Sequence, residues 1–184
     1  MLRSGRRRVV TLLVAAATCS ALALGGCGDD AKGTSVAEVP FSAPDGATAT
    51  VGDFTGRPLV VNMWATNCKP CVKEMPAIDE VAAELDGSVQ IIGVNVFDTP
   101  ENAASFAADL GVGYQQFTDP DGRLSTALSV TGLPATAFFS ADGTLLDVHQ
   151  GAYTADELRD AIAQQFSDDT ASTPDSPAPE GTTP

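Results

Sequence analysis

The sequence predicts an α/β protein with a central mixed β-sheet flanked by helices. Between residues 40 and 166, segments with the apolar pattern of buried strands alternate with segments of helical periodicity. A hairpin pattern follows this alternation and adds antiparallel strands to the sheet. The length of 184 residues, 43% of them hydrophobic, suits a single domain that buries its own core.

The first half of this domain is expected to contain two strands and two helices. Residues 59–64 are an apolar run rich in β-branched side chains, which is typical of a buried strand, and residues 90–96 form a second such run. Between them, apolar residues recur at helical spacing and the pattern ends near Gly87; these residues are Cys71, Met75, Ile78, Ala82 and Leu85. Residues 99–110 are expected to form the second helix, because a threonine cap and a proline open it.

The second half is expected to contain a short helix, a hairpin and a final helix. The Asp-Pro-Asp-Gly turn at 119–122 leads into a short helix over residues 123–128. Residues 135–140 and 144–150 are expected to pair across an Ala-Asp-Gly turn. The capping box at 154–157 predicts the start of the last helix.

The first 26 residues have the features of a bacterial export signal. A basic stretch ends at Arg8, and the apolar run over 9–24 is shorter than the about 20 residues that span a membrane. The Leu-Gly-Gly-Cys sequence that ends at Cys27 resembles a lipobox, in which the cysteine is lipid-modified and becomes the first residue of the mature protein. Lipidation of Cys27 would tether the domain to the membrane through acyl chains. The alternatives are an uncleaved anchor helix and an ordinary signal peptide.

Two polar segments are expected to flank the folded domain. Residues 27–39 show no apolar periodicity and are interpreted as a lipidated, flexible spacer. Residues 167–184 are rich in Pro, Ser, Thr and Asp and contain no large apolar side chain, which predicts a disordered tail. The folded unit is therefore placed at residues 40–166.

The charge of the chain excludes one class of partner. The formal net charge is −14, and the sequence beyond residue 26 holds 6 Lys and Arg against 24 Asp and Glu. Such a chain is repelled by nucleic acid phosphates and by anionic membrane surfaces. Nucleic acid binding is therefore excluded.

The cysteines divide into three uses. Four cysteines in an exported chain first suggest two structural disulfides. However, Cys19 is expected to leave with the signal peptide and Cys27 to carry lipid, so no structural disulfide is expected. Cys68 and Cys71 form a C-x-x-C motif where a strand turns into a helix, and the helix N-terminus stabilises a thiolate there. We therefore expect Cys68 to be the nucleophile and Cys71 to resolve the mixed disulfide that Cys68 forms.

Three other uses of this motif fit the sequence less well. A zinc site needs two further ligands, and no second paired motif supplies them. Covalent haem attachment needs a histidine directly after the second cysteine, where Val72 stands. A purely structural bridge does not explain the position at a strand-to-helix turn with Lys-Pro between the thiols. No metal and no bound cofactor is therefore expected.

The motif and its surroundings resemble the TlpA-type thiol-disulfide oxidoreductases, which are membrane-attached extracytoplasmic relatives of thioredoxin. The resemblance rests on residues 62–66 (Asn-Met-Trp-Ala-Thr) and 68–76 (Cys-Lys-Pro-Cys-Val-Lys-Glu-Met-Pro). It continues through 132–136 (Gly-Leu-Pro-Ala-Thr), Asp142-Gly143 and Gly151, and so covers most of the predicted domain. It implies a thioredoxin-like fold.

The resemblance also assigns two further site residues. Pro134 is expected to be a cis-proline that faces the two cysteines and leaves the backbone of Leu133 free to pair with an extended substrate. Glu74 lies three residues after Cys71 on the same side of the helix, and we expect it to assist the deprotonation of Cys71. The alternative for Glu74 is a solvated acid on the helix face. One departure from the family is Asn67, which stands where tryptophan is common and leaves the partner preference open.

The resemblance implies a reducing role toward exported cysteine-containing proteins, including apocytochrome c in cytochrome c maturation. The electrons would come from a membrane thiol carrier. The first alternative is an oxidase of the same fold that donates disulfides. The second is a copper metallochaperone of the same fold that uses both thiols and a histidine, and the third is a binding module with a vestigial site. His149 and Trp64 are expected to be structural residues.

Overall fold

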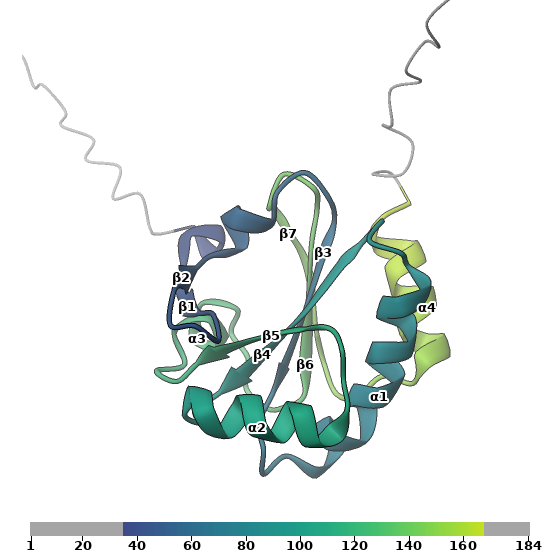
Figure 1. The fold of residues 1–184 in the computed structure, drawn as a ribbon. Coiled ribbons are helices and arrows are strands. Elements are labelled where there is room, and N and C mark those ends of the chain that lie inside the picture. Colours follow the sequence, from purple (N-terminus) through teal and green to yellow (C-terminus); the bar gives the residue numbers. More distant parts are fainter. Residues whose placement is uncertain (1–34, 168–184) are drawn as a thin grey trace, which may run out of the picture. The chain divides into compact units, whose positions relative to one another are not determined.

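The computed structural model describes residues 35–167, which form one mixed β-sheet with helices on both faces (Figure 1). The strand order is β2-β1-β5-β4-β3-β6-β7. The strands are β1 (Phe41–Ser42), β2 (Thr48–Ala49), β3 (Leu59–Trp64), β4 (Gln90–Val96), β5 (Gln115–Asp119), β6 (Ala135–Phe139) and β7 (Leu145–Gln150). β3, β4 and β5 are mutually parallel, whereas β6 and β7 are antiparallel to their neighbours. The expected mixed α/β class is confirmed.

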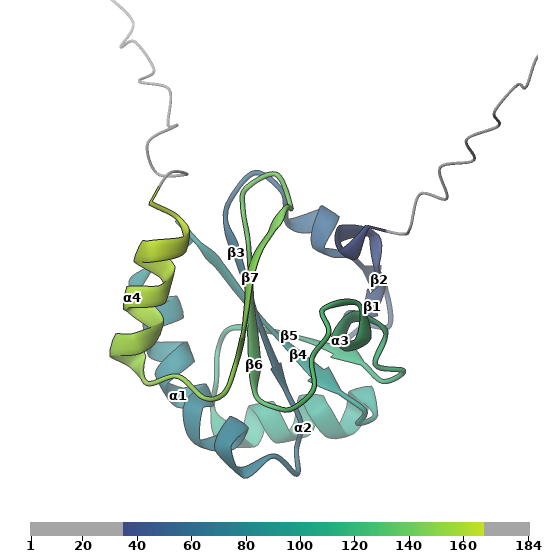
Figure 2. The same cartoon turned by 180° about the vertical axis from the view of Figure 1, so that it is seen from behind.

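The two faces of the sheet carry separate apolar cores. The α-helices are α1 (Lys69–Glu84), α2 (Pro100–Leu110), α3 (Arg123–Ala127) and α4 (Ala155–Gln165), and the 3-10 helices are η1 (Val36–Glu38) and η2 (Val51–Phe54). α1 and α4 lie on one side of the sheet and α3 on the other (Figures 1 and 2). The side chains of β3 alternate between the two cores, with Val61 in one and Val60 in the other. Both faces of this strand are buried, which explains its continuous apolar sequence.

Most of the predicted elements are confirmed within a residue or two. β3 and β4 begin and end where the apolar runs predict, and α2 has the expected cap, since the Thr99 hydroxyl accepts a hydrogen bond from the Asn102 amide. β6 and β7 form the predicted hairpin. The capping box of α4 is also present, with Thr154 and Glu157 bonded reciprocally.

The sequence did not predict β1, β2 or β5. β5 contains a single large apolar residue, Phe117, so it lacks the apolar run that identified its neighbours. It is nevertheless held between β4 and β1, with Val94 opposite Phe117. Pairing on both edges and burial of its second half therefore override a weak local pattern.

The ordered domain begins before the predicted boundary at Pro40. Residues 36–38 form η1, and Val39 is buried in the same core as Val51 of η2. Apolar side chains in this short segment, rather than a periodic pattern, anchor it. The predicted signal peptide, lipidated Cys27, residues 28–34 of the spacer and the tail from residue 168 lie outside the described residues.

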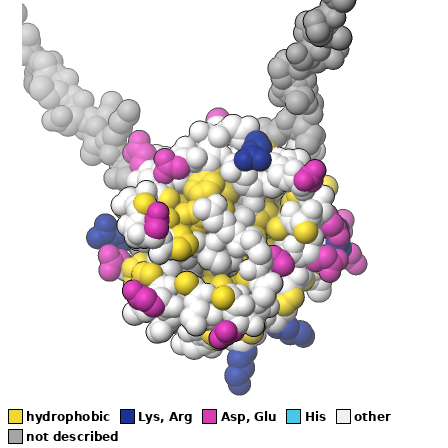
Figure 3. All heavy atoms as spheres, in the orientation of Figure 1, with side chains coloured by type: hydrophobic (Ala, Val, Ile, Leu, Met, Phe, Trp, Pro, Cys, Tyr) yellow, Lys and Arg dark blue, Asp and Glu magenta, His cyan; other side chains and the backbone are white. Residues whose placement is uncertain are grey.

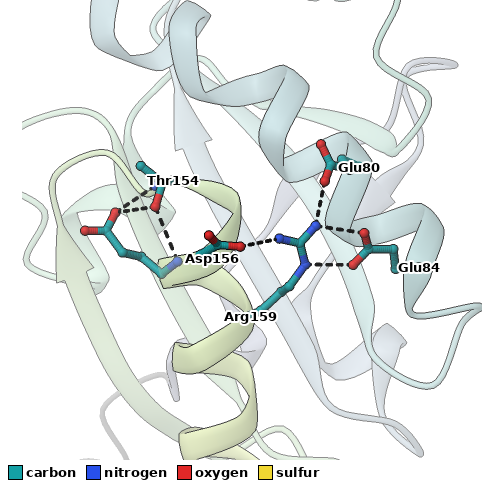
Figure 4. Close-up of polar contacts among 6 residues, drawn as sticks. Glu80, Glu84, Thr154, Asp156 and Arg159 are labelled. Carbon is teal, nitrogen blue, oxygen red and sulfur yellow. Dashed lines mark hydrogen bonds and ion pairs between the residues drawn. The ribbon is translucent and has the colours of Figure 1, made fainter.

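An ion-pair cluster joins α4 to α1. The Arg159 guanidinium on α4 lies 2.6 Å from a carboxylate oxygen of Glu80 and 2.7 Å from one of Glu84, both on α1 (Figure 4). Asp156, one turn earlier on α4, completes the cluster at 2.8 Å. The Arg159 side chain lowers the pKa of Glu84 through a hydrogen bond. The cluster thus holds together the two helices that cover the core containing Cys71.

Within residues 35–167, no helix has the length and apolar character that crossing a membrane requires.

Candidate active site

Cys68 and Cys71 lie at the carboxyl end of β3, an inner strand of the sheet, where the chain passes into α1. The two cysteines form a disulfide with a Cα–Cα distance of 5.3 Å. Cys68 is the N-cap of α1, and its sulfur accepts a hydrogen bond from the Cys71 amide at 3.3 Å. Cys68 is partly exposed, whereas Cys71 is fully buried. An incoming sulfur can therefore reach Cys68 first, and the helix N-terminus favours a thiolate at that position.

The loop before Cys68 is tied to the neighbouring strand. The backbone amide and the hydroxyl of Thr66 both donate hydrogen bonds to the Asp98 carboxylate, each at 2.9 Å. The buried Asn95 side chain donates a third bond to Asp98 at 2.9 Å. Asp98 is partly desolvated, which raises its pKa, but these three bonds outweigh that effect and leave the pKa below its usual value. An ionised carboxylate thus holds the loop two residues before the reactive cysteine.

Pro134 lies on the other side of β3 from the Asp98 clamp, which is the set of hydrogen bonds that Thr66 and Asn95 donate to Asp98. The Leu133–Pro134 peptide bond is cis, as the resemblance implied. β6 begins directly after it and runs antiparallel to β3, with Ala135 opposite Met63. The carboxyl end of β3 and the start of β6 therefore meet at the sheet edge that carries Cys68. Leu133 and Cys68 also pack against the same core.

Glu74 is buried one turn after Cys71, with 2% of its surface exposed, so the alternative of a solvated surface acid is wrong. Its Oε1 accepts a hydrogen bond from the Asn62 amide at 2.8 Å, and its Oε2 accepts one from the Tyr153 backbone amide at 2.9 Å. Burial raises the pKa of Glu74 to about 7, although both hydrogen bonds lower it. A carboxyl group with this pKa can take up or release a proton near neutral pH.

The orientation of Asn62 is set by Tyr114. The Tyr114 hydroxyl donates to the Asn62 side-chain oxygen at 3.3 Å, so the amide nitrogen faces Glu74. Burial raises the pKa of Tyr114, and the phenol remains a donor. Tyr114, Tyr153 and Asp98 were not predicted from the sequence. Asp98 follows a buried strand, which is a weak signal, whereas nothing local marks the two tyrosines.

The structure does not bring His149 and the two cysteines together as a ligand set. Within residues 35–167, no three His, Cys, Asp or Glu side chains form a group that could hold a metal ion. The His149 ring, on β7, instead stacks on Tyr153 with a centroid distance of 4.2 Å. In the described part of the chain, the two cysteines and His149 therefore do not form the ligand set that the copper alternative requires. Trp64 is fully buried and so has the expected structural position.

The fold and the disulfide at a helix N-terminus define a thioredoxin-like thiol-disulfide oxidoreductase. Residues 28–148 match the model of the AhpC/TSA family, and the chain belongs to this family.

Named relatives agree with this class. The chain is 34% identical to the thiol:disulfide interchange protein DsbE of Pseudomonas fluorescens biotype C over 120 residues, which cover 65% of this chain and 66% of that protein. It is 31% identical to the thiol:disulfide interchange protein CycY of Rhizobium leguminosarum bv. viciae, with 72% and 78% covered. The fold is also similar to a secreted Mycobacterium tuberculosis disulfide oxidoreductase homologous to E. coli DsbE. The TM-score is 0.62 and the identity 25%, over 70% of this chain and 97% of that one.

Proposed function

We propose that the protein is an extracytoplasmic lipoprotein that reduces disulfides of exported proteins, and that its setting is cytochrome c maturation. The observation that carries this proposal is the asymmetry of the cysteine pair, with Cys68 partly exposed and Cys71 buried one helical turn before Glu74, a buried carboxyl of raised pKa. The secreted and interchange proteins among the relatives support the location and the reaction class. The proposed membrane attachment is a lipid on Cys27.

The reaction begins with both cysteines reduced. The Cys68 thiolate attacks one sulfur of the client disulfide, which forms a mixed disulfide and releases the other client sulfur as a thiolate. Glu74 then accepts the proton of Cys71, and the Cys71 thiolate attacks the Cys68 sulfur. The second client sulfur leaves, and the Cys68–Cys71 disulfide remains. Two electrons have passed to the client, and a membrane thiol carrier returns the pair to the reduced state.

The proposal is tested by insulin reduction with dithiothreitol as the electron source. We expect the purified protein to reduce insulin disulfides and the Cys68→Ser variant to be inactive. The Cys27→Ser variant is the matched control, because it removes a cysteine without touching the exchanging pair and should keep the activity. Insulin reduction by Cys68→Ser at the wild-type rate would contradict the mechanism.

The direction of electron flow is tested by the reduction potential of the pair. Equilibration with glutathione buffers, followed by alkylation of free thiols, measures this potential. A reductase requires a potential near that of thioredoxin, about −270 mV, and a value near about −120 mV would assign the disulfide-donating role instead.

A further inference from the structure

A shallow pocket of about 420 Å³ lies beside the active-site loop. Thr66 and Asn67, the two residues before Cys68, form one wall. The other wall belongs to α2, which passes beside the segment leading into α1 (Figure 1). The α2 residues that line the pocket are spaced by three, four and seven positions, so they share one helix face; they are Asn102, Ser105, Phe106 and Asp109.

Both walls are held in place by the surrounding structure. The centroids of the Phe106 and Trp64 rings lie 6.0 Å apart. Trp64 is fully buried, and its indole N–H donates a hydrogen bond to the Gln116 side chain at 3.0 Å. Thr66 is held by its two hydrogen bonds to Asp98. The pocket is therefore preformed, and a ligand would spend little free energy on ordering it.

The polar lining of the pocket suits a positive charge. Asp109 contributes a carboxylate that makes no hydrogen bond or ion pair within residues 35–167, and Asn67 and Asn102 contribute amides. No Lys or Arg side chain is among the residues that line it. Phe106 offers an aromatic ring, against which a long aliphatic stem packs and to which a cation is attracted.

The charge of the whole domain favours the same ligand. Residues 35–167 contain 18 Asp and Glu but five Lys and Arg. Acidic side chains surround the hydrophobic patches on the face shown in Figure 3. This excess attracts cationic segments and speeds their encounter with the site.

We propose that this pocket binds a Lys or Arg side chain of the client polypeptide, close in sequence to the cysteine that Cys68 attacks. The inference rests on the proposed exchange with polypeptide disulfides. It adds a specificity determinant beside the reacting sulfur, built by Asp109 and the ring of Phe106. An anionic side chain meets the Asp109 carboxylate there and is disfavoured.

The test uses peptides whose one cysteine is in a mixed disulfide with thionitrobenzoate, so that reduction releases a coloured thiol. The peptides differ at one position at a time, which is one of the two positions before the cysteine or one of the two positions after it. At that position each set carries Lys, Gln or Glu. With the reduced protein at low salt, the Lys peptide of the best position should react about fivefold faster than its Gln partner. The Glu peptide should react more slowly than both, and 0.5 M salt should remove most of these differences.

The Asp109→Asn variant should bring the Lys-to-Gln rate ratio close to one. The matched control is Asp160→Asn, which removes one exposed acid from α4 and should keep the wild-type ratio. A Lys-to-Gln rate ratio near one for the wild type at every position would contradict binding of a cationic side chain in the pocket. An equal loss of this ratio in both variants would do the same. Either result leaves disulfide exchange itself intact. No reaction of the wild type with any peptide or with bis(2-hydroxyethyl) disulfide would instead contradict the proposed function.

Discussion

Glu74 combines deep burial with a task that needs a proton acceptor. A carboxylate inside a protein is stable only when hydrogen bonds compensate for lost hydration. Here Asn62 and the Tyr153 amide supply one bond to each oxygen, and burial still raises the pKa to about 7. The carboxyl group is therefore divided between its two protonation states at neutral pH, which suits exchange of a proton with Cys71.

The raised pKa predicts how stability depends on pH. Between pH 4.5, the ordinary pKa of the group, and about 7, the folded protein holds a proton on Glu74 that the unfolded chain has lost. The stability that this proton contributes is fully present below pH 4.5. As the pH rises through 7 it is lost, and the free energy of unfolding falls by up to about 3 kcal/mol. Glu74→Gln should remove that slope from the free energy of unfolding, measured by urea titration at pH 4.5 and 7.5. The same variant should slow insulin reduction; equal slopes and unchanged rates would contradict the assignment.

At the scale of elements, the loop between β3 and α1 depends on the end of β4. β4 lies parallel to β3, so both carboxyl ends reach the same edge of the sheet. Asp98 follows β4 and accepts both donors of Thr66. The position of Cys68 thus rests on a contact between two strand ends 32 residues apart in sequence.

Removing this clamp should loosen the loop. Asp98→Ala is expected to lower the free energy of unfolding by about 1 kcal/mol, because Thr66 and Asn95 lose a charged acceptor in a partly solvated place. It should also slow insulin reduction. Asp98→Asn keeps one acceptor, so its free energy of unfolding and its rate of insulin reduction should lie between those of the wild type and of Asp98→Ala. Urea titrations and rates that match the wild type for Asp98→Ala would show that the loop is held by other contacts.

At the scale of the whole molecule, the topology gathers the site from distant segments. β3 brings Cys68, β4 brings Asp98, the start of β6 brings Pro134, and the segment before α4 brings the Tyr153 amide to Glu74. α2 adds the wall of the proposed pocket. Clustering at the carboxyl ends of parallel strands is the usual place for sites in α/β sheets.

The sequence predicted those parts of this arrangement that have local signals. The apolar runs predicted β3 and β4, and the cap residues predicted α2 and α4, because these patterns follow from burial and end effects of single elements. β5 was missed because its stability comes from its neighbours rather than from its own residues. Glu74 was found through the family resemblance, but the Tyr153 contact joins residues 79 positions apart and no local pattern reports it.

In the proposed exchange, Cys68 attacks the client and Cys71 releases it. The most direct measurement expresses Cys71→Ser and Cys68→Ser in the native host and compares their covalent complexes on non-reducing gels, after thiols are blocked with acid and alkylating agent. Dithiothreitol-sensitive complexes with exported proteins are expected for Cys71→Ser, because the partly exposed Cys68 is left without its resolving partner, and none are expected for Cys68→Ser. Complexes formed by Cys68→Ser, or none formed by Cys71→Ser, would contradict it.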